Sequence, residues 1–242
     1  MTDYPEPKKF SAVSNTGLLR SVNEDRYLLK KCEDGSLLMA VADGLGGLMA
    51  GDVAAQIVVD TIDELDCAGQ KPLHELAKLV LKANGLVMAT AKEHWASKDM
   101  GSTVIAILIR QGVGHWVNVG DSRLYLFRRG KLKQLSTDQN LAQQLWEDHI
   151  LTNVEARRHP LSSVLDQCVG GGALDLETGE LRIEAGDTIL LCTDGLYSDL
   201  DPGTKTEILS SDRSIGKKLE KMIYEALAAG GRDNITVAAA EF

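Results

Sequence analysis

Two short, largely apolar runs, each ending in Asp-Gly, constrain the fold of this chain more than any other feature of its sequence. Residues 37–42 (LLMAVA) lead into Asp43-Gly44, and residues 189–193 (ILLCT) lead into Asp194-Gly195. A run of this kind is typical of a strand that is buried on both faces. Each strand therefore delivers a carboxylate to the rim of a hydrophobic core, where a charge is costly unless it is paired or binds a cation.

The rest of the pattern predicts strands in adjacent pairs and helices in pairs. Strands are expected at residues 10–14, 26–32, 36–42, 103–110, 115–119, 124–128, 188–192 and 234–240, with a hairpin turn at Asp34-Gly35. Apolar residues at helical spacing predict helices at residues 52–66, 73–95, 140–147 and 215–227. Strands joined by short turns pair in antiparallel fashion, so the expected fold class is α+β.

Length and composition are those of a globular protein. The chain has 242 residues, of which 44% are hydrophobic and 25% charged, and it can bury a core without help from disulfides or metals. It contains no repeat and no linker, so one domain is expected over residues 1–242. Within it we expect residues 1–9 to be a flexible N-terminus and the polar residues 148–172 to form a mobile flap.

Charge and cysteine content exclude several partners. With 26 Lys and Arg against 35 Asp and Glu, the net charge is −9, and the sequence has no basic patch that would suit nucleic acid. No apolar run is long enough to span a membrane. The four cysteines, Cys32, Cys67, Cys168 and Cys192, lie far apart without metal-binding spacing. We therefore expect reduced thiols in a cytoplasmic protein. We also expect the protein to be a monomer.

Acidic residues stand at the ends of several expected strands. Asp43-Gly44 does not lead into a hairpin partner, which favours a functional site over a turn, whereas Asp194-Gly195 suits either. Residues 23–25 (NED), 117–123 (VNVGDSR) and 230–234 (GGRDN) each suit a solvated turn when taken singly. Together they supply carboxylates without a paired His or thiolate, which is the ligand chemistry of Mg²⁺ or Mn²⁺. Spacing alone does not show that they meet in space.

Six short motifs follow one another along the chain: TGLLRSVNED (16–25), VADGLGG (41–47), MGST (100–103), VGDSR (119–123), CTDGL (192–196) and GRDNITV (231–237). They stand in the order seen in metal-dependent protein phosphatases of the 2C type, which the chain therefore resembles. The chain resembles this family over residues 10–242, and EARRHP (155–160) resembles the flap of its compact bacterial members. The resemblance implies a four-layer α-β-β-α sandwich, in which helix pairs flank two antiparallel sheets and two Mn²⁺ or Mg²⁺ ions bind at one end.

The resemblance also implies a set of metal ligands. Asp43 matches the carboxylate that bridges both ions, and Gly44 matches the residue whose carbonyl oxygen is a ligand. Asp194 and Asp233 match ligands of one ion, while Glu24 matches a contact to the other through water.

Further residues match supporting positions. Asp25 would lie behind the ligands, and Asp121 would hold a weaker third ion together with Asp194. Arg20 matches the residue that grips the substrate phosphate, and its planar guanidinium group suits bidentate binding of two phosphoryl oxygens. Leu45 departs from the pattern, because animal relatives have a His there and bacterial relatives usually have Met. Leucine cannot donate a proton to the leaving group.

The expected function is hydrolysis of phosphoserine and phosphothreonine in proteins, reversing a bacterial Ser/Thr kinase. Two cations can lower the pKa of a water molecule and neutralise phosphoryl oxygens, so no covalent phosphoenzyme is needed. The catalytic set would be Arg20, Asp43, Asp194 and Asp233. One alternative is a phosphoprotein-binding pseudophosphatase, which would be expected to lack one of these ligands. Another is a two-metal nuclease, which the charge of −9 disfavours.

Overall fold

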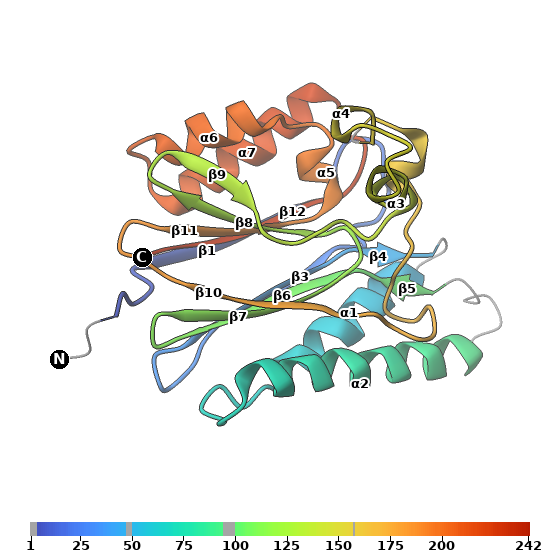
Figure 1. The fold of residues 1–242 in the computed structure, drawn as a ribbon, viewed down its shortest axis with the longest axis horizontal. Coiled ribbons are helices and arrows are strands. Elements are labelled where there is room, and N and C mark those ends of the chain that lie inside the picture. Colours follow the sequence, from blue (N-terminus) through green and yellow to red (C-terminus); the bar gives the residue numbers. More distant parts are fainter. Residues whose placement is uncertain (1–3, 47–49, 94–99, 157) are drawn as a thin grey trace.

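The computed structural model describes residues 4–46, 50–93, 100–156 and 158–242, and its strands form two stacked five-stranded sheets (Figure 1). Neighbouring strands in both sheets are antiparallel. One sheet has the order β1 (Lys9–Asn15), β12 (Ile235–Glu241), β11 (Thr188–Cys192), β8 (Arg123–Arg128), β9 (Lys131–Gln134). The other has the order β10 (Glu177–Arg182), β7 (Val113–Val119), β6 (Val104–Arg110), β3 (Leu37–Ala42), β2 (Arg26–Lys31).

Helices cover both outer faces of this sandwich (Figure 1). α1 (Ala50–Asp63) and α2 (Pro72–Glu93) pack on the sheet that contains β3, and α6 (Pro202–Ser210) and α7 (Ile215–Ala229) pack on the sheet that contains β11. The predicted four-layer α-β-β-α sandwich is confirmed. Among the described residues, no helix has both the length and the apolar character needed to cross a membrane.

The two apolar runs are central strands that are buried on both faces, as predicted. Every residue of β3 is fully buried, and alternate side chains point in opposite directions. Leu37, Met39 and Val41 face the other sheet, whereas Leu38, Ala40 and Ala42 face α1 and α2. β11 shows the same alternation between the inter-sheet core and the layer beneath α7. Both strands end at the same end of the sandwich, where the candidate site lies (Figure 1).

Most predicted elements are present with small shifts at their ends, and the Asp34-Gly35 hairpin turn joins β2 to β3. Trp95, the expected end of the second helix, lies outside the described residues. The pattern did not predict β9, β10, α6 or the short elements β4 (Gly44–Leu45), β5 (Gly101–Ser102), α4 (Asn153–Ala156), η1 (Pro160–Ser163) and α5 (Asp194–Tyr197). β10 is an edge strand with charged residues, and Ile208 and Leu209 are the only buried apolar residues of α6, so neither has a strong apolar period.

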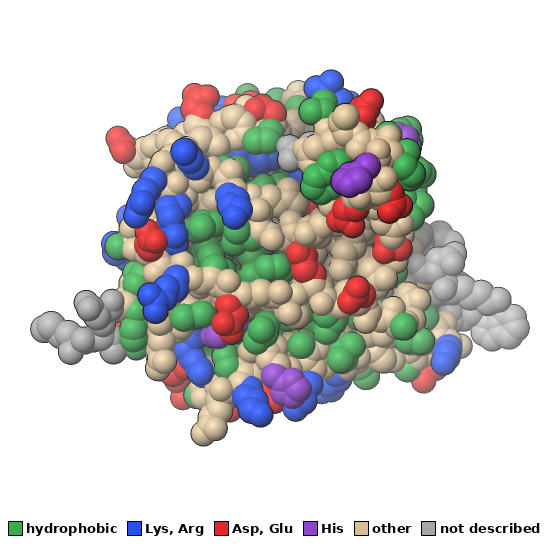
Figure 2. Space-filling model, in the orientation of Figure 1, with side chains coloured by type: hydrophobic (Ala, Val, Ile, Leu, Met, Phe, Trp, Pro, Cys, Tyr) green, Lys and Arg blue, Asp and Glu red, His purple; other side chains and the backbone are tan. Residues whose placement is uncertain are grey.

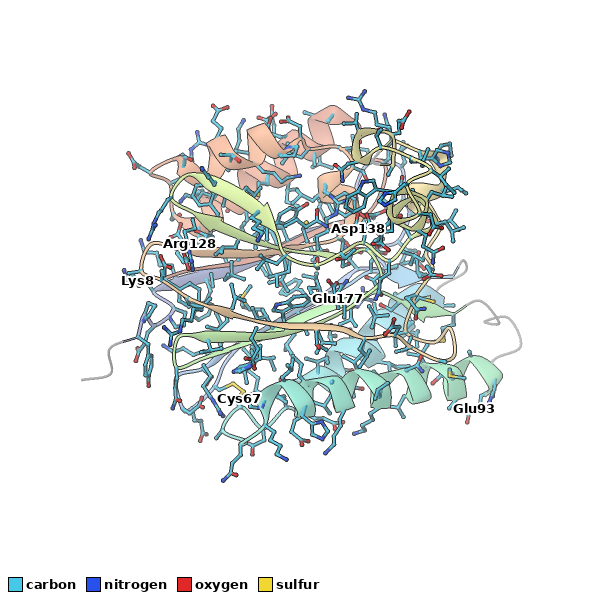
Figure 3. All side chains as sticks on the ribbon, viewed as in Figure 1. Lys8, Cys67, Glu93, Arg128, Asp138 and Glu177 are labelled. Carbon is cyan, nitrogen blue, oxygen red and sulfur yellow. A yellow bond between two sulfur atoms is a disulfide. The ribbon has the colours of Figure 1, made fainter. Side chains whose placement is uncertain are left out.

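The expectation of four reduced thiols is wrong for one pair of cysteines. Cys32, which follows β2, forms a disulfide with Cys67 in the connection between α1 and α2. Cys67 is labelled in Figure 3. The two residues are 35 positions apart, and sequence distance did not reveal that the hairpin and the helix connection meet at the same end of the fold. Cys168 and Cys192 are free thiols.

Candidate functional site

Carboxylates from four separate segments gather where β3 and β11 end. Asp43 follows β3, Asp194 begins α5, Asp121 precedes β8 and Asp233 precedes β12. Asp43 lies close enough to Asp25, Asp121, Asp194 and Asp233 for each of these charges to raise its pKa. The structure therefore brings together the acids that the sequence could only place at strand ends.

Hydrogen bonds from β5 and the residue after it hold the backbone of Asp43. Its N–H donates to Thr103 Oγ1 at 3.0 Å, and its carbonyl oxygen accepts from Thr103 N at 2.9 Å and from Ser102 Oγ at 3.0 Å. The next residue must be glycine, because a Cβ atom on Gly44 would lie 2.2 Å from the carbonyl oxygen of Gly51 in α1. The turn after β3 is thus fixed on both sides.

Some carboxylate oxygens in this cluster lack a hydrogen-bond partner. Asp25 is 3% exposed, and its Oδ2 accepts from Thr193 Oγ1 at 2.9 Å. Asp25 Oδ1 and Asp194 Oδ1 are buried without a partner among the described residues. Buried charged oxygens without partners are costly, so the cluster is suited to an additional positive ligand.

Burial and mutual repulsion raise the pKa values of the cluster. Burial is the largest cause in each case, and it raises the pKa of Asp25, Asp121 and Asp194 to about 7. The pKa of Asp43 is raised well above its ordinary value, first by burial and then by its acidic neighbours. A cation at this place would favour the ionised forms and lower these pKa values again.

Arg20 lies at the mouth of the cluster on a loop held by the segment before β12. Its Nη2 donates to Asp233 Oδ2 at 2.7 Å, although its side chain is 51% exposed. The amide of Asn234 holds the loop by donating to the carbonyl oxygens of Thr16 and Val22, at 2.8 and 2.9 Å. Arg20 can therefore reach both Asp233 and solvent from a fixed backbone.

Glu24 lies on the side of the cluster next to α1. Its backbone N–H donates to Asn234 Oδ1 at 2.7 Å, and its carboxylate lies beside the backbone of Gly51 in α1. Burial, followed by the lesser effect of neighbouring acids such as Asp52, raises its pKa, while Arg20 lowers it. Asp52 Oδ1 is also buried without a partner within the described part of the chain.

The donor chemistry of these residues fits divalent cations such as Mn²⁺ and Mg²⁺. Every side chain predicted to bind metal offers carboxylate oxygens, and Gly44 offers a backbone carbonyl. As the described side chains stand, no three His, Cys, Asp or Glu residues converge closely enough to hold an ion. Asp233 Oδ2 accepts from Arg20 and its Oδ1 accepts from the N–H of Asn234, so an ion bound by Asp233 would compete with these two donors.

Sequence reasoning gave no role to Tyr197, Arg123 or Asp138. The Tyr197 hydroxyl donates to Asp121 Oδ2 at 2.9 Å, and the guanidinium carbon of Arg123 lies 3.3 Å from the centroid of the Tyr197 ring. Arg123 in turn donates from Nε and Nη2 to the two oxygens of Asp138, which is labelled in Figure 3 near α3 (Leu141–Glu147). Only Arg123 fell within a motif, so the sequence carried little signal for this network.

The model of the protein phosphatase 2C family matches residues 20–227 of this chain. The chain belongs to the protein phosphatase 2C family. It is 34% identical over 235 residues to the Ser/Thr protein phosphatase PstP of Mycobacterium tuberculosis, covering 96% of this chain but 45% of PstP. It is 31% identical to the Ser/Thr phosphatase stp of Listeria monocytogenes, covering 93% of this chain and 92% of stp.

Solved structures of family members share the fold. The crystal structure of M. tuberculosis PstP matches with a TM-score of 0.89 at 32% identity, covering 97% of this chain and 98% of that chain. A second structure, of the PstP catalytic domain in complex with two manganese ions, matches with a TM-score of 0.87 at 32% identity, covering 96% and 97% of the two chains.

Gly47 and Arg157, which belong to the family motifs, lie outside the described residues.

Proposed function

We propose that this chain hydrolyses phosphoserine and phosphothreonine in proteins and that it needs divalent cations to do so. The observation that carries the proposal is a cluster of carboxylates with raised pKa values beside an exposed arginine at one end of the sandwich. Family membership and the two manganese ions of the PstP catalytic domain support this assignment. The chain spans about half the length of PstP, so its activity and substrates are proposals.

Two Mn²⁺ or Mg²⁺ ions, and a weaker third, would be held by oxygen donors of this cluster. Asp43 would bridge the first two with the Gly44 carbonyl as a further ligand, and Asp194 and Asp233 would bind one of them. Such ions supply an activated water and neutralise charge on the phosphoryl group.

Three further acidic residues would support the proposed metal centre. Glu24 would reach the second ion through water. Asp121 would share the third ion with Asp194, and the Tyr197 hydroxyl orients the Asp121 carboxylate for this role. Asp25 would fix the position of the segment before α5 through its hydrogen bond with Thr193.

Arg20 would bind the phosphoryl group of the substrate. A cation held by Asp233 would weaken its ion pair with Arg20, and the guanidinium group could then bind two phosphoryl oxygens side by side. Leu45, half-buried in β4, has no proton to give, so the alcohol that leaves must take its proton from water or from the surroundings of the substrate.

The alternative of a silent phosphoprotein-binding module predicts a lost ligand. Asp43, Asp194 and Asp233 are all present, which favours the enzyme. We further propose that the chain is a single domain and a monomer, and that its substrates are the phosphoprotein products of a Ser/Thr kinase.

A cytoplasmic location remains a prediction. The Cys32–Cys67 disulfide argues against it, because cytosolic thiols are kept reduced.

The test is hydrolysis of p-nitrophenyl phosphate and a phosphothreonine peptide with Mn²⁺, with EDTA, and by an Asp233→Asn variant. We expect activity that needs Mn²⁺ and falls by about a hundredfold or more in the variant. Folded, Mn²⁺-loaded protein that binds the phosphopeptide without hydrolysing either substrate would contradict the proposal and favour the binding module.

A further inference from the structure

A polar cavity of about 390 Å³ lies beside the carboxylate cluster. Its lining comes from β8, β9 and the segment after β9, from α3, α4 and η1, and from α5, α6 and Ser198 between them. Asp194 belongs both to this lining and to the carboxylate cluster. The volume falls within the range of about 300–1,000 Å³ that is usual for ligand pockets, and exceeds what a single phosphate group fills.

The cations of this cavity already have partners, so it is not built to hold an anion. Arg123 donates to both oxygens of Asp138 and, through Nη1, to the Tyr125 hydroxyl at 3.1 Å. Lys205 is 1% exposed, and its Nζ donates to the carbonyl oxygen of Leu200 at 2.6 Å. An acidic group bound here would have to share Arg123 with Asp138, and the Lys205 ammonium is too buried to reach it.

Uncharged polar groups of the lining are uncommitted. Within the described residues, Gln143 Oε1, Asn140 Nδ2 and the hydroxyl groups of Ser162 and Ser198 make no hydrogen bond, although all four residues line the cavity. Both donors and acceptors are therefore available. An amide side chain, which has one group of each kind, is the best match for such a lining.

We propose that this cavity receives an uncharged amide side chain, Gln or Asn, of the substrate polypeptide close to the phosphorylated residue. The inference rests on the proposed function, because a phosphorylated residue at Asp43 and Asp194 places its neighbours at the cavity wall that Asp194 shares. An extended chain advances about 3.3 Å per residue, so a side chain within a few positions reaches the cavity. Trp146, 37% exposed on α3, gives the side-chain stem an apolar surface to pack against.

The experiment uses phosphothreonine peptides in which one position at a time carries Gln, Leu or Glu. For each peptide, kcat/KM is measured with Mn²⁺, and Kd is measured independently by fluorescence anisotropy. We expect one position at which Gln is preferred about tenfold over Leu and Glu, the discrimination given by one or two hydrogen bonds.

Two variants and a control assign this preference to the cavity. Gln143→Leu keeps the size of the side chain but removes its carbonyl oxygen, and should abolish the preference for Gln over Leu. Ser162→Trp fills the cavity, and should lower kcat/KM for the peptides about tenfold relative to p-nitrophenyl phosphate. Ser210→Trp makes the same change at an exposed position of α6 outside the cavity, and should leave that ratio at the wild-type value.

The outcomes separate this inference from the proposed function. A Ser162→Trp protein with the wild-type Tm and the wild-type ratio of peptide to aryl phosphate hydrolysis would overturn the cavity assignment. A preference for Glu would overturn the amide assignment. If the protein hydrolyses neither substrate, but Ser162→Trp weakens binding of the Gln peptide about tenfold, the proposed function fails while the cavity inference stands.

Discussion

β11 has one buried carboxylate near each of its ends, and the two differ in whether the chain supplies a cation to pair with them. Asp187, just before β11, is 1% exposed and fully paired: Arg128 donates to its two oxygens at 2.7 and 2.6 Å, and the N–H of Glu184 donates at 2.7 Å. Asp194, just after β11, has one buried oxygen without a partner among the described residues and a pKa of about 7.

The difference separates acids that hold the fold from acids that await a ligand. At the Asp187 end the chain supplies its own cations, and Figure 2 shows Lys and Arg side chains gathered over the β8–β9 hairpin there. The Cys32–Cys67 disulfide lies toward the same end (Figure 3). At the other end the only cation that pairs with a carboxylate of the cluster is the exposed Arg20, among the ion pairs of the described residues.

The largest expected effect comes from exchanging Asp for Asn at the two ends of β11. Asp194→Asn should lower kcat by about 1,000-fold or more, because it removes a proposed metal ligand worth several kcal/mol in the transition state. In EDTA its Tm should equal or exceed that of the wild type, because a repelling carboxylate is gone. Asp187→Asn should lower Tm, because it breaks the ion pair with Arg128, and should leave kcat at the wild-type value. Equal losses of kcat in both variants would break the comparison; the exposed Asp212→Asn is the control.

The sequence predicted the carboxylate end better than the paired end. The continuous apolar runs identified β3 and β11 without any family resemblance, and Asp43 and Asp194 follow them directly in the sequence. That Asp43, Asp121 and Asp233 meet came from the family resemblance, since chain spacing does not encode which strand ends are neighbours.

Other features could not be predicted because they depend on tertiary contacts. The disulfide joins two loops whose approach is set by the packing of α1 on the sheet. The stack of Arg123 on Tyr197 brings together residues from a strand and a distant helix. The alternating charged residues of β10 became a strand only because the edge of β7 was available to pair with.

The next largest effect concerns the disulfide at the paired end. Replacing Cys32 and Cys67 together by alanine should lower the free energy of unfolding by about 4 kcal/mol, since the two residues are 35 positions apart and the bond closes the loop between them. Urea denaturation measures this loss. We expect kcat/KM to be unchanged, because the bond is remote from the carboxylate cluster. Dithiothreitol should destabilise the wild type and not the double variant; a wild type that is indifferent to reductant would contradict the prediction.

A smaller loss is expected from breaking the Arg128–Asp187 pair. Arg128→Met keeps much of the side-chain volume but leaves the buried Asp187 without its bidentate partner, and should cost about 2 kcal/mol in the free energy of unfolding. Arg129→Met is the matched control, because Arg129 is 83% exposed and forms a surface ion pair with Glu184. Its cost should stay below about 0.5 kcal/mol. Similar costs for both variants would mean that burial of Asp187 does not decide the effect.

The smallest expected effect is on the pH dependence of Tm, with and without Mn²⁺, and it tests whether the carboxylate cluster binds a cation. The folded pKa values of Asp25, Asp121 and Asp194 are raised to about 7, so between about pH 4 and 7 the folded state binds more protons than the unfolded state. In EDTA, Tm should therefore fall as the pH rises through this window. Added Mn²⁺ competes with these protons, so it should stabilise the protein more at about pH 8 than at about pH 6. For one proton displaced, the difference is about 1.4 kcal/mol in the free energy of unfolding, or about 3–6 °C in Tm. Asp187→Asn should keep this pH dependence, because Asp187 is already paired with Arg128, whereas Asp194→Asn should reduce it. If Mn²⁺ raises Tm equally at both pH values, the metal does not bind the carboxylates whose pKa values are raised.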